Sequence, residues 1–222
     1  MMWLMILLSW FFLVDASGLS AADPPQNPLS DHENGRPVIV AFGDSLTAGL
    51  GLPVDQAYPA QLERRLREAG DPHRVINAGV SGDTTAGGVR RVDAVLALHP
   101  SIVIVEFGAN DGLRGLSLSQ TRTNLAAILD RFRSASVPVL LAGMKLPPNY
   151  GPEYTDEFTA IFPDLARTYG ATLIPFFLDG VATHPQLNQV DGIHPTAEGY
   201  SVIVDHLLPL LRPLLNRHAR VP

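Results

Sequence analysis

Ser45 follows an apolar run that stops at a glycine, within the stretch IVAFGDSLTAGLGL at residues 39–52. A serine hydroxyl is a weak nucleophile at neutral pH and needs a nearby base, most often a histidine, to take its proton. Most serines that follow strands are turn residues. Whether Ser45 is a nucleophile therefore depends on whether the chain also supplies a base, an acid that orients the base, and donors for an oxyanion.

Asp191 and His194 stand three residues apart in DGIHP, toward the C-terminal end of the chain. That spacing puts both side chains on one side of a turn or of an incipient helix. A carboxylate on the far ring nitrogen of a histidine fixes the tautomer and stabilises the imidazolium that forms when the ring accepts a proton. An isolated pair of this kind is also typical of a surface turn with a helix-capping histidine.

Three groups could hold an oxyanion, and each preorganised donor of this type contributes about 3–4 kcal/mol to transition-state binding. Ser45 offers its own backbone N–H at the start of a helix. Gly82 has no side chain, so a substrate could approach its N–H closely. Asn110 offers a side-chain amide. As alternatives, Gly82 could serve only a turn that needs a positive φ, and Asn110 could belong to an ordinary turn.

Short runs rich in Val and Ile alternate along the chain with longer segments of helical periodicity. Several runs are apolar throughout, which is typical of a parallel sheet covered on both faces. We therefore predict an α/β protein, a three-layer α/β/α sandwich around a mainly five-stranded parallel sheet. The predicted strands are residues 37–43, 74–79, 101–108, 137–143 and 171–176. The predicted helices are residues 56–70, 85–99, 119–135, 153–170 and 196–215, the last with prolines expected to bend or end it.

These elements would bring the candidate residues together, because ligand sites in such sheets lie beyond the carboxyl ends of the strands. Ser45 follows the first predicted strand, Gly82 the second and Asn110 the third. Asp191 and His194 precede the last predicted helix. Four loops would each supply a different part of one site, and this combination favours a catalytic serine over a set of unrelated turns.

Four blocks, in this order, resemble the SGNH (GDSL) hydrolase family, which is named for an invariant Ser, Gly, Asn and His. The blocks are FGDSLTAG with Ser45, NAGVSGDTT with Gly82, EFGANDGLRG with Asn110, and DGIHPT with Asp191 and His194. The family's donor glycine directly precedes Asp-Thr, so the resemblance selects Gly82 as the donor and leaves Gly79 as a turn residue.

The resemblance covers about residues 37–215 and extends to GANDGLRGL, LPPNYG and IPFFL. These segments are similar to periplasmic enzymes of Gram-negative bacteria that act as thioesterases, arylesterases and lysophospholipases. The resemblance implies a flavodoxin-like SGNH fold, with Ser45 as nucleophile, His194 as base and Asp191 as the acid that orients it. It also implies an oxyanion hole with three donors, from Ser45, Gly82 and Asn110.

The substrate pocket is less well marked in the sequence. In enzymes of this family the loop that corresponds to residues 111–119 lines the acyl site and moves on binding. On that basis we expect acyl-chain contacts from Leu113, Leu116, Leu146, Pro147 and Ile193. The alternative is that these side chains only close the core.

We predict a serine esterase for carboxylic esters or thioesters, of arylesterase, thioesterase or lysophospholipase type, that acts through an acyl-enzyme on Ser45. The substrate would be a small-molecule or lipid ester. One alternative is a carbohydrate O-acetylesterase of the same family, and another is a non-catalytic envelope binding protein on the same fold. An α/β-hydrolase is excluded, because the chain has no G-x-S-x-G elbow. The sequence does not indicate whether the protein is a monomer or an oligomer.

Composition excludes several other chemistries. The net charge is −6 and Lys145 is the only lysine, so we expect no nucleic-acid partner, and no P-loop surrounds that lysine. The absence of cysteine excludes thiol nucleophiles, cysteine-ligated zinc and disulfides. No residues have metal-ligand spacing, and we expect neither a metal nor another cofactor. We expect Glu106 to be a buried, hydrogen-bonded carboxylate that supports the loops, and Asp44 to be a loop anchor.

Residues 2–14, MWLMILLSWFFLV, form an apolar run that is too short to span a bilayer comfortably. Small residues follow, as in a signal peptide, and cleavage after Gly18 or Ala22 would fit. No Lys or Arg precedes the run, so an uncleaved anchor is the alternative. We predict a signal peptide at 1–22, a flexible lead-in at 23–35, the hydrolase domain at 36–215 and a tail at 216–222. The mature protein would be periplasmic or secreted, with no stable membrane span.

Overall fold

The computed structural model describes residues 35–218. The predicted signal peptide, all of the predicted lead-in except Gly35, and residues 219–222 lie outside the described residues. Among residues 35–218, no helix combines the length and the apolar character needed to cross a membrane.

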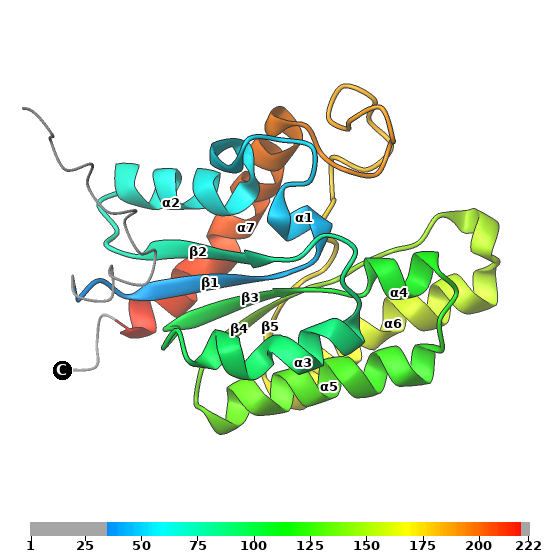
Figure 1. The fold of residues 1–222 in the computed structure, drawn as a ribbon, viewed down its shortest axis with the longest axis horizontal. Coiled ribbons are helices and arrows are strands. Elements are labelled where there is room, and N and C mark those ends of the chain that lie inside the picture. Colours follow the sequence, from blue (N-terminus) through cyan, green and yellow to red (C-terminus); the bar gives the residue numbers. More distant parts are fainter. Residues whose placement is uncertain (1–34, 219–222) are drawn as a thin grey trace, which may run out of the picture. The chain divides into compact units, whose positions relative to one another are not determined.

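One parallel sheet runs through the centre of the fold, with its five strands in the order β2-β1-β3-β4-β5 (Figure 1). The strands are β1 Val38–Gly43, β2 Arg74–Gly79, β3 Ile102–Glu106, β4 Val139–Ala142 and β5 Thr172–Ile174. The predicted α/β fold is confirmed, and each strand falls within its predicted range. Strands β1 and β3 are buried along their whole length, as their unbroken Val- and Ile-rich runs predict.

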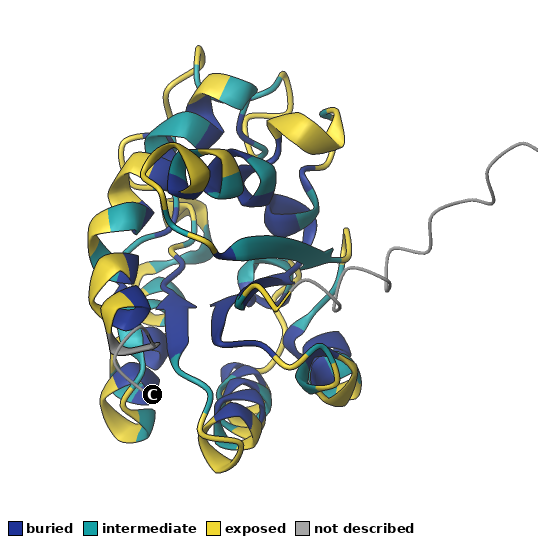
Figure 2. Ribbon diagram, turned by 90° about the vertical axis from the view of Figure 1, so that its left-hand side faces the viewer, coloured by how far each residue is buried: buried dark blue, intermediate teal, exposed yellow. Residues whose placement is uncertain are grey.

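Helices cover both faces of the sheet. Helices α2 and α7 lie on one face, and α3, α5 and α6 lie on the other (Figure 1). The five long helices are α2 Tyr58–Glu68, α3 Thr85–Leu96, α5 Leu118–Ser134, α6 Pro152–Tyr169 and α7 Ala197–His218. The short ones are α1 Ser45–Ala48, α4 Ala109–Leu113 and the 3₁₀ turns η2 Val54–Gln56 and η3 Pro148–Tyr150. Figure 2 shows the buried residues concentrated in the interior and the exposed residues on the outer sides of the helices, as amphipathic periodicity requires.

The register of the sheet aligns three strand ends. Gly43, the last residue of β1, pairs with Gly79 of β2 and with Glu106 of β3. The loops that follow these strands therefore start side by side. This alignment brings the segments that hold Ser45, Gly82 and Asn110 to one edge of the sheet.

Two local features differ from the sequence predictions. Helix α7 continues through Pro209 and Pro213 to His218, three residues into the predicted tail. Both prolines are exposed, so the ring and the missing N–H lie on the solvent side, where water can satisfy the freed carbonyl groups. Helix α4 occupies a segment for which the sequence also allowed an ordinary turn.

Candidate active site

Ser45, His194 and Asp191 form a continuous hydrogen-bonded chain. His194 Nε2 lies 2.9 Å from Ser45 Oγ, although the two residues are 149 positions apart in the sequence. His194 Nδ1 lies 2.6 Å from Asp191 Oδ2. The second oxygen, Asp191 Oδ1, accepts the backbone N–H groups of Ile193 at 2.9 Å and of His194 at 3.0 Å. The structure thus brings together the predicted nucleophile, base and acid in the order that proton transfer requires.

Hydrogen bonding lowers the pKa of Asp191 to about 2, and the largest contribution comes from the backbone N–H of His194. Asp191 is therefore a carboxylate over the whole neutral range. A carboxylate accepts, so Nδ1 carries the ring proton and Nε2 is free to accept from the serine hydroxyl.

The backbone around Ser45 is tightly constrained. Ser45 begins α1, and Asp44 caps this short helix by accepting the Leu46 N–H at 3.0 Å. A Cβ at Gly43 would lie 2.1 Å from Thr47 Oγ1 and 2.6 Å from the Glu106 carbonyl oxygen, so only glycine fits there. Ser45 itself is 8% exposed. The nucleophile candidate consequently sits on a sharp strand-to-helix turn with little freedom to move.

The predicted oxyanion donors differ in their availability. Within residues 35–218, neither the Ser45 N–H nor the Gly82 N–H donates to a protein acceptor. Gly82 adopts φ +79°, which favours glycine. Asn110 is engaged, because its Nδ2 donates to Asp44 Oδ2 at 3.0 Å and to the Asp83 carbonyl at 2.9 Å. To hold an oxyanion, Asn110 must share one of these two N–H groups or turn it toward the substrate.

Gly79 and Gly82 have different surroundings, in agreement with the choice made from the sequence. A Cβ at Gly79 would lie 2.2 Å from the backbone nitrogen of Ala48, so this glycine is needed for packing against α1. A Cβ at Gly82 would meet only Arg114 Nη2, at 3.6 Å. Gly82 is therefore the glycine with open space beside its backbone.

Comparison with known proteins assigns the family. The sequence profile of the GDSL-like Lipase/Acylhydrolase family matches residues 41–202, which is well over half of the chain. The chain belongs to this family. The esterase TesA of Pseudomonas aeruginosa is 42% identical over 178 residues, covering 80% of this chain and 89% of that protein. The thioesterase 1/protease 1/lysophospholipase L1 of Escherichia coli K12 is 40% identical over 179 residues, covering 80% and 85%.

A solved structure agrees with this assignment. The crystal structure of AlinE4, a SGNH-hydrolase family esterase, matches with a TM-score of 0.68 and 47% identity, covering 84% of this chain and 98% of that one. The resemblance drawn from the four sequence blocks is thus confirmed at the level of family and fold.

Arg91 joins the loops of this GDSL-family site from beneath, a role that the sequence did not predict. Its Nε donates to Asp83 Oδ2 at 2.8 Å, Nη1 to the Ala78 carbonyl at 2.9 Å and Nη2 to the Gly43 carbonyl at 3.1 Å. The guanidinium also lies over the Phe42 ring, 4.8 Å from its centroid. One side chain from α3 therefore holds the ends of β1 and β2 together.

The segment after Asn110 is held by contacts that cross the fold. Asp111 accepts the Thr85 N–H at 2.9 Å and the Thr85 hydroxyl at 2.5 Å. Tyr150 donates to the Leu113 carbonyl at 2.8 Å, and Tyr154 donates to the Leu116 carbonyl at 2.9 Å. These hydroxyls come from η3 and α6, so the loop after β4 anchors the loop after β3. Sequence reasoning missed both tyrosines, because only their place in LPPNYG and just beyond it could have drawn attention to them.

The five predicted substrate-contact residues fall into two groups. Leu116 and Ile193 are 42% and 47% exposed, and Pro147 is also exposed. Leu146 packs against the core, and its side chain fills the space beside Gly112, where a Cβ would lie 2.6 Å away. Leu113 is half-buried in α4. Leu146 therefore helps to close the core, as the alternative interpretation of the sequence held.

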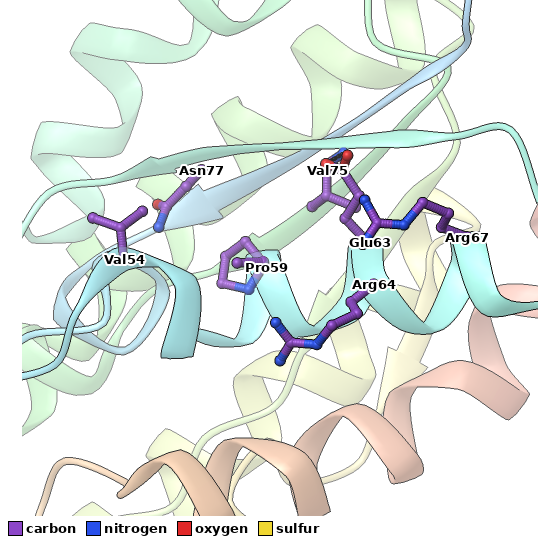
Figure 3. A pocket seen from close by; sticks show the side chains of 8 residues that line it. Val54, Pro59, Glu63, Arg64, Arg67, Val75 and Asn77 are labelled. Atoms are coloured by element: carbon purple, nitrogen blue, oxygen red, sulfur yellow. Dashed lines mark hydrogen bonds between the residues drawn. The ribbon is translucent and has the colours of Figure 1, made fainter.

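A surface hollow lies elsewhere, between α2 and the edge strand β2 (Figure 3). Its lining is Val54, Pro59, Ala60, Glu63, Arg64, Arg67, Val75 and Asn77. None of these is a predicted site residue. Glu63 Oε2 accepts the Val75 N–H at 2.9 Å and thereby covers a donor of the exposed sheet edge. The hollow is explained by the packing of a helix on an edge strand.

Proposed function

We propose that this GDSL-family hydrolase cleaves carboxylic esters and thioesters through an acyl-enzyme on Ser45. The observation that carries the proposal is the Ser45–His194–Asp191 chain, with links of 2.9 and 2.6 Å. These links lie within the distance over which a base can take a hydroxyl proton as the hydroxyl attacks. The esterase and thioesterase names of the relatives support the same reaction class.

The reaction runs in two halves. Ser45 Oγ attacks the carbonyl carbon while His194 Nε2 takes the hydroxyl proton, and the carbonyl π electrons move onto oxygen. When the tetrahedral intermediate collapses, the bond to the leaving oxygen or sulfur breaks, and His194 gives that atom the proton. In the second half His194 deprotonates a water, which attacks the acyl carbon. Collapse of the second intermediate returns the proton to Ser45 and releases the acid.

The oxyanion is held in both halves by the Ser45 and Gly82 N–H groups, which are free, and by an N–H of Asn110. Asp191 stays charged because its pKa is about 2, and it stabilises the imidazolium of His194 in each intermediate. Together these donors and this charge stabilise the transition state more than the ground state, as catalysis requires.

An apolar rim favours substrates with an apolar acyl or aryl group. We define the rim as five exposed large apolar side chains on segments at the carboxyl ends of the strands: Leu50, Val80, Leu116, Val190 and Ile193. In the described residues the one other exposed large apolar side chain is Val54, in the hollow beside α2, and exposed apolar surface of this kind marks binding sites. An acetylated sugar would make little use of the rim. We assign substrate contacts to Leu113, Leu116, Pro147 and Ile193, with Leu146 behind them.

A chain-length series tests this assignment. Hydrolysis of nitrophenyl esters from acetyl to palmitoyl should rise in kcat/KM as the acyl chain lengthens, and acetylated xylo-oligosaccharides should be poor substrates. The opposite preference would favour the O-acetylesterase alternative. Ser45→Ala is the matched control, since it removes the nucleophile from an almost buried position. No hydrolysis by the wild type with any ester would favour the non-catalytic envelope binding protein.

We also propose that residues 1–22 export the protein to the periplasm or beyond. Support comes from the apolar run at residues 2–14 and the small residues after it. Expression of the full chain in a Gram-negative bacterium, followed by fractionation and intact-mass measurement, tests the proposal. Cleavage after Gly18 or Ala22 gives a mature chain that starts at Leu19 or Asp23. The full-length mass in the membrane fraction would instead identify an uncleaved anchor.

A further inference from the structure

Two carboxyl groups are fully buried beneath Ser45. Asp44 and Glu106 are both 0% exposed, and no arginine or lysine of residues 35–218 forms an ion pair with either. Burial raises the pKa of both groups, and the charge of Asp44 raises that of Glu106 further. Two negative charges in one buried site without a cation are strongly unfavourable, so such a pair retains a proton.

The hydrogen bonds indicate which of the two carboxyl groups carries this proton. Glu106 Oε2 accepts from the Thr47 hydroxyl at 2.8 Å and from the Asp44 N–H at 3.3 Å, but Oε1 is buried with no partner in the described residues. Asp44 has better partners, because Oδ1 accepts from Leu46 and Oδ2 from Asn110. Burial and the Asp44 charge raise the pKa of Glu106 well above its usual value, whereas the pKa of Asp44 rises to about 6. The hydrogen-bond geometry therefore favours Glu106 over Asp44 as the group that keeps the proton.

The pair reaches the oxyanion hole through Asp44. Asp44 Oδ2 is one of the two acceptors that hold the Asn110 amide, and the Asp44 backbone N–H is itself fixed by Glu106. Thr47 ties the same glutamic acid to α1, the helix that begins with Ser45. A change in the charge of Glu106 would therefore alter the hydrogen bonds that hold the Ser45 turn and the Asn110 amide.

We propose that Glu106 is a positioning residue of the oxyanion hole, which holds a proton at neutral pH and, through Asp44, sets the orientation of the Asn110 amide. The proposal rests on the proposed function, since it takes Asn110 as an oxyanion donor. During the reaction the oxyanion and the Asp44 carboxylate compete for the N–H groups of Asn110. A second negative charge on Glu106 would strengthen the hold of the carboxyl pair on the amide and weaken its support of the oxyanion.

Other titratable and charged side chains lie around Glu106. Tyr58 of α2 and Tyr200 of α7 face it, and burial raises the pKa of both hydroxyls well above the usual value. Arg91 of α3 donates to the Gly43 carbonyl beside the pair. His194 is the remaining neighbour and acts electrostatically on Asp44. The titratable and charged groups that face the carboxyl pair are thus two tyrosines, one arginine and the catalytic base.

The protonation state has a direct spectroscopic test. Infrared spectra of the wild type and Glu106→Gln in heavy water at neutral and mildly alkaline pH should differ by a buried carboxylic-acid C=O band, present only in the wild type. If the difference spectrum instead shows carboxylate bands, Glu106 is ionised and the proposal is overturned. This readout does not need substrate, so it is independent of whether the proposed esterase function holds.

Kinetics test the positioning role. Glu106→Gln keeps a neutral group of the same shape, so kcat for nitrophenyl butyrate should stay within about 3-fold of the wild type. Glu106→Leu removes the acceptor for Thr47 and the Asp44 N–H, and should lower kcat by about 10-fold or more with KM little changed, a smaller loss than that from deleting a donor outright. Equal kcat values for the two variants would contradict the proposal.

A second pair of variants covers the case in which Glu106→Leu fails to fold. Thr47→Val removes the donor to Glu106 Oε2 and should lower kcat several-fold. Ser101→Ala is the matched control, because this buried hydroxyl donates to the Val38 carbonyl at the far end of the sheet. It should lower the melting temperature without changing kcat. If Thr47→Val also changes only the melting temperature, the role of Glu106 is structural and the proposal fails.

Discussion

Arg114 Nη2 lies 2.9 Å from the carbonyl oxygen of Gly82, and this contact ties the end of α4 to the loop after β2. The same nitrogen lies 3.3 Å from Asn110 Oδ1. One guanidinium thus contacts both of the oxyanion donors that come from outside the nucleophile turn. It binds the carbonyl oxygen of Gly82 and the side-chain oxygen of Asn110, and so links the two segments that carry these donors.

Replacing Arg114 should therefore weaken catalysis more than binding. Arg114 is exposed, so we expect Arg114→Met to lower kcat by only about 5- to 10-fold, about 1 kcal/mol, with KM within 2-fold. Steady-state kinetics on nitrophenyl butyrate check this. Arg133→Met is the matched control, because within residues 35–218 that exposed arginine pairs only with Asp130 and Tyr169, far from the site. An equal loss in the control would show that Arg114 has no special role.

Gly79 and Gly82 should respond differently to alanine. Gly79→Ala places a Cβ against the α1 backbone, and we expect a loss of about 2–3 kcal/mol in the free energy of unfolding, within the range of overpacked cores. Gly82→Ala has space but is strained at φ +79°, and should cost about 1 kcal/mol.

For kcat the order of the two variants should be the reverse, with the larger loss in Gly82→Ala. Gly82→Ala turns a free N–H out of place, so its kcat should fall by about 10-fold or more. Urea unfolding and kcat, measured on both proteins at 25 °C, decide the matter. A larger loss of kcat in folded Gly79→Ala than in Gly82→Ala would reverse the assignment of the donor.

The buried Asp44–Glu106 pair should make the free energy of unfolding depend on pH. The pKa of Glu106 is raised in the folded protein, so between the ordinary glutamic-acid pKa of about 4 and the raised value the folded state binds more protons than the unfolded state. Its contribution to the free energy of unfolding therefore falls as pH rises through that window. Glu106→Gln has no such penalty.

We accordingly expect Glu106→Gln to gain stability relative to the wild type as pH rises from 4 to 8. The gain should reach about 1–3 kcal/mol, the cost of a buried polar group without a partner. Urea unfolding curves at four pH values across this range give the comparison. A difference that stays constant with pH would mean that Glu106 ionises normally.

Asp191 should contribute to kcat, but its own titration should not appear at the acidic end of the pH–rate profile. Asp191→Asn leaves the shape of the loop but offers no charge to the imidazolium, and should lower kcat by about 100-fold or more. Because the pKa of Asp191 is about 2, the wild-type kcat/KM should show no titration of this carboxyl group above about pH 3. Rates of the two proteins from pH 4 to 9 check both statements. A variant with nearly wild-type kcat would remove Asp191 from the mechanism.

The sequence predicted the sheet and the strand ends that the loops with Ser45, Gly82 and Asn110 follow, because unbroken apolar runs and strand-end motifs are local signals. It did not predict that Pro209 and Pro213 stay inside α7, since their tolerance depends on which side of the helix faces water. It missed Arg91 and Arg114, which donate to backbone carbonyl groups on distant segments of the chain. The engagement of both Asn110 N–H groups was equally out of reach, because it depends on how Asp44 and Asp83 are placed in three dimensions.

The most direct test of the account is covalent trapping of the nucleophile. Intact-mass and peptide-mass measurement after treatment with a fluorophosphonate should show one adduct, located on Ser45, in the wild type and no adduct in Ser45→Ala. His194→Ala should label at least about 100-fold more slowly, because the base is missing. An adduct on another serine, or no adduct on the folded wild type, would contradict the account.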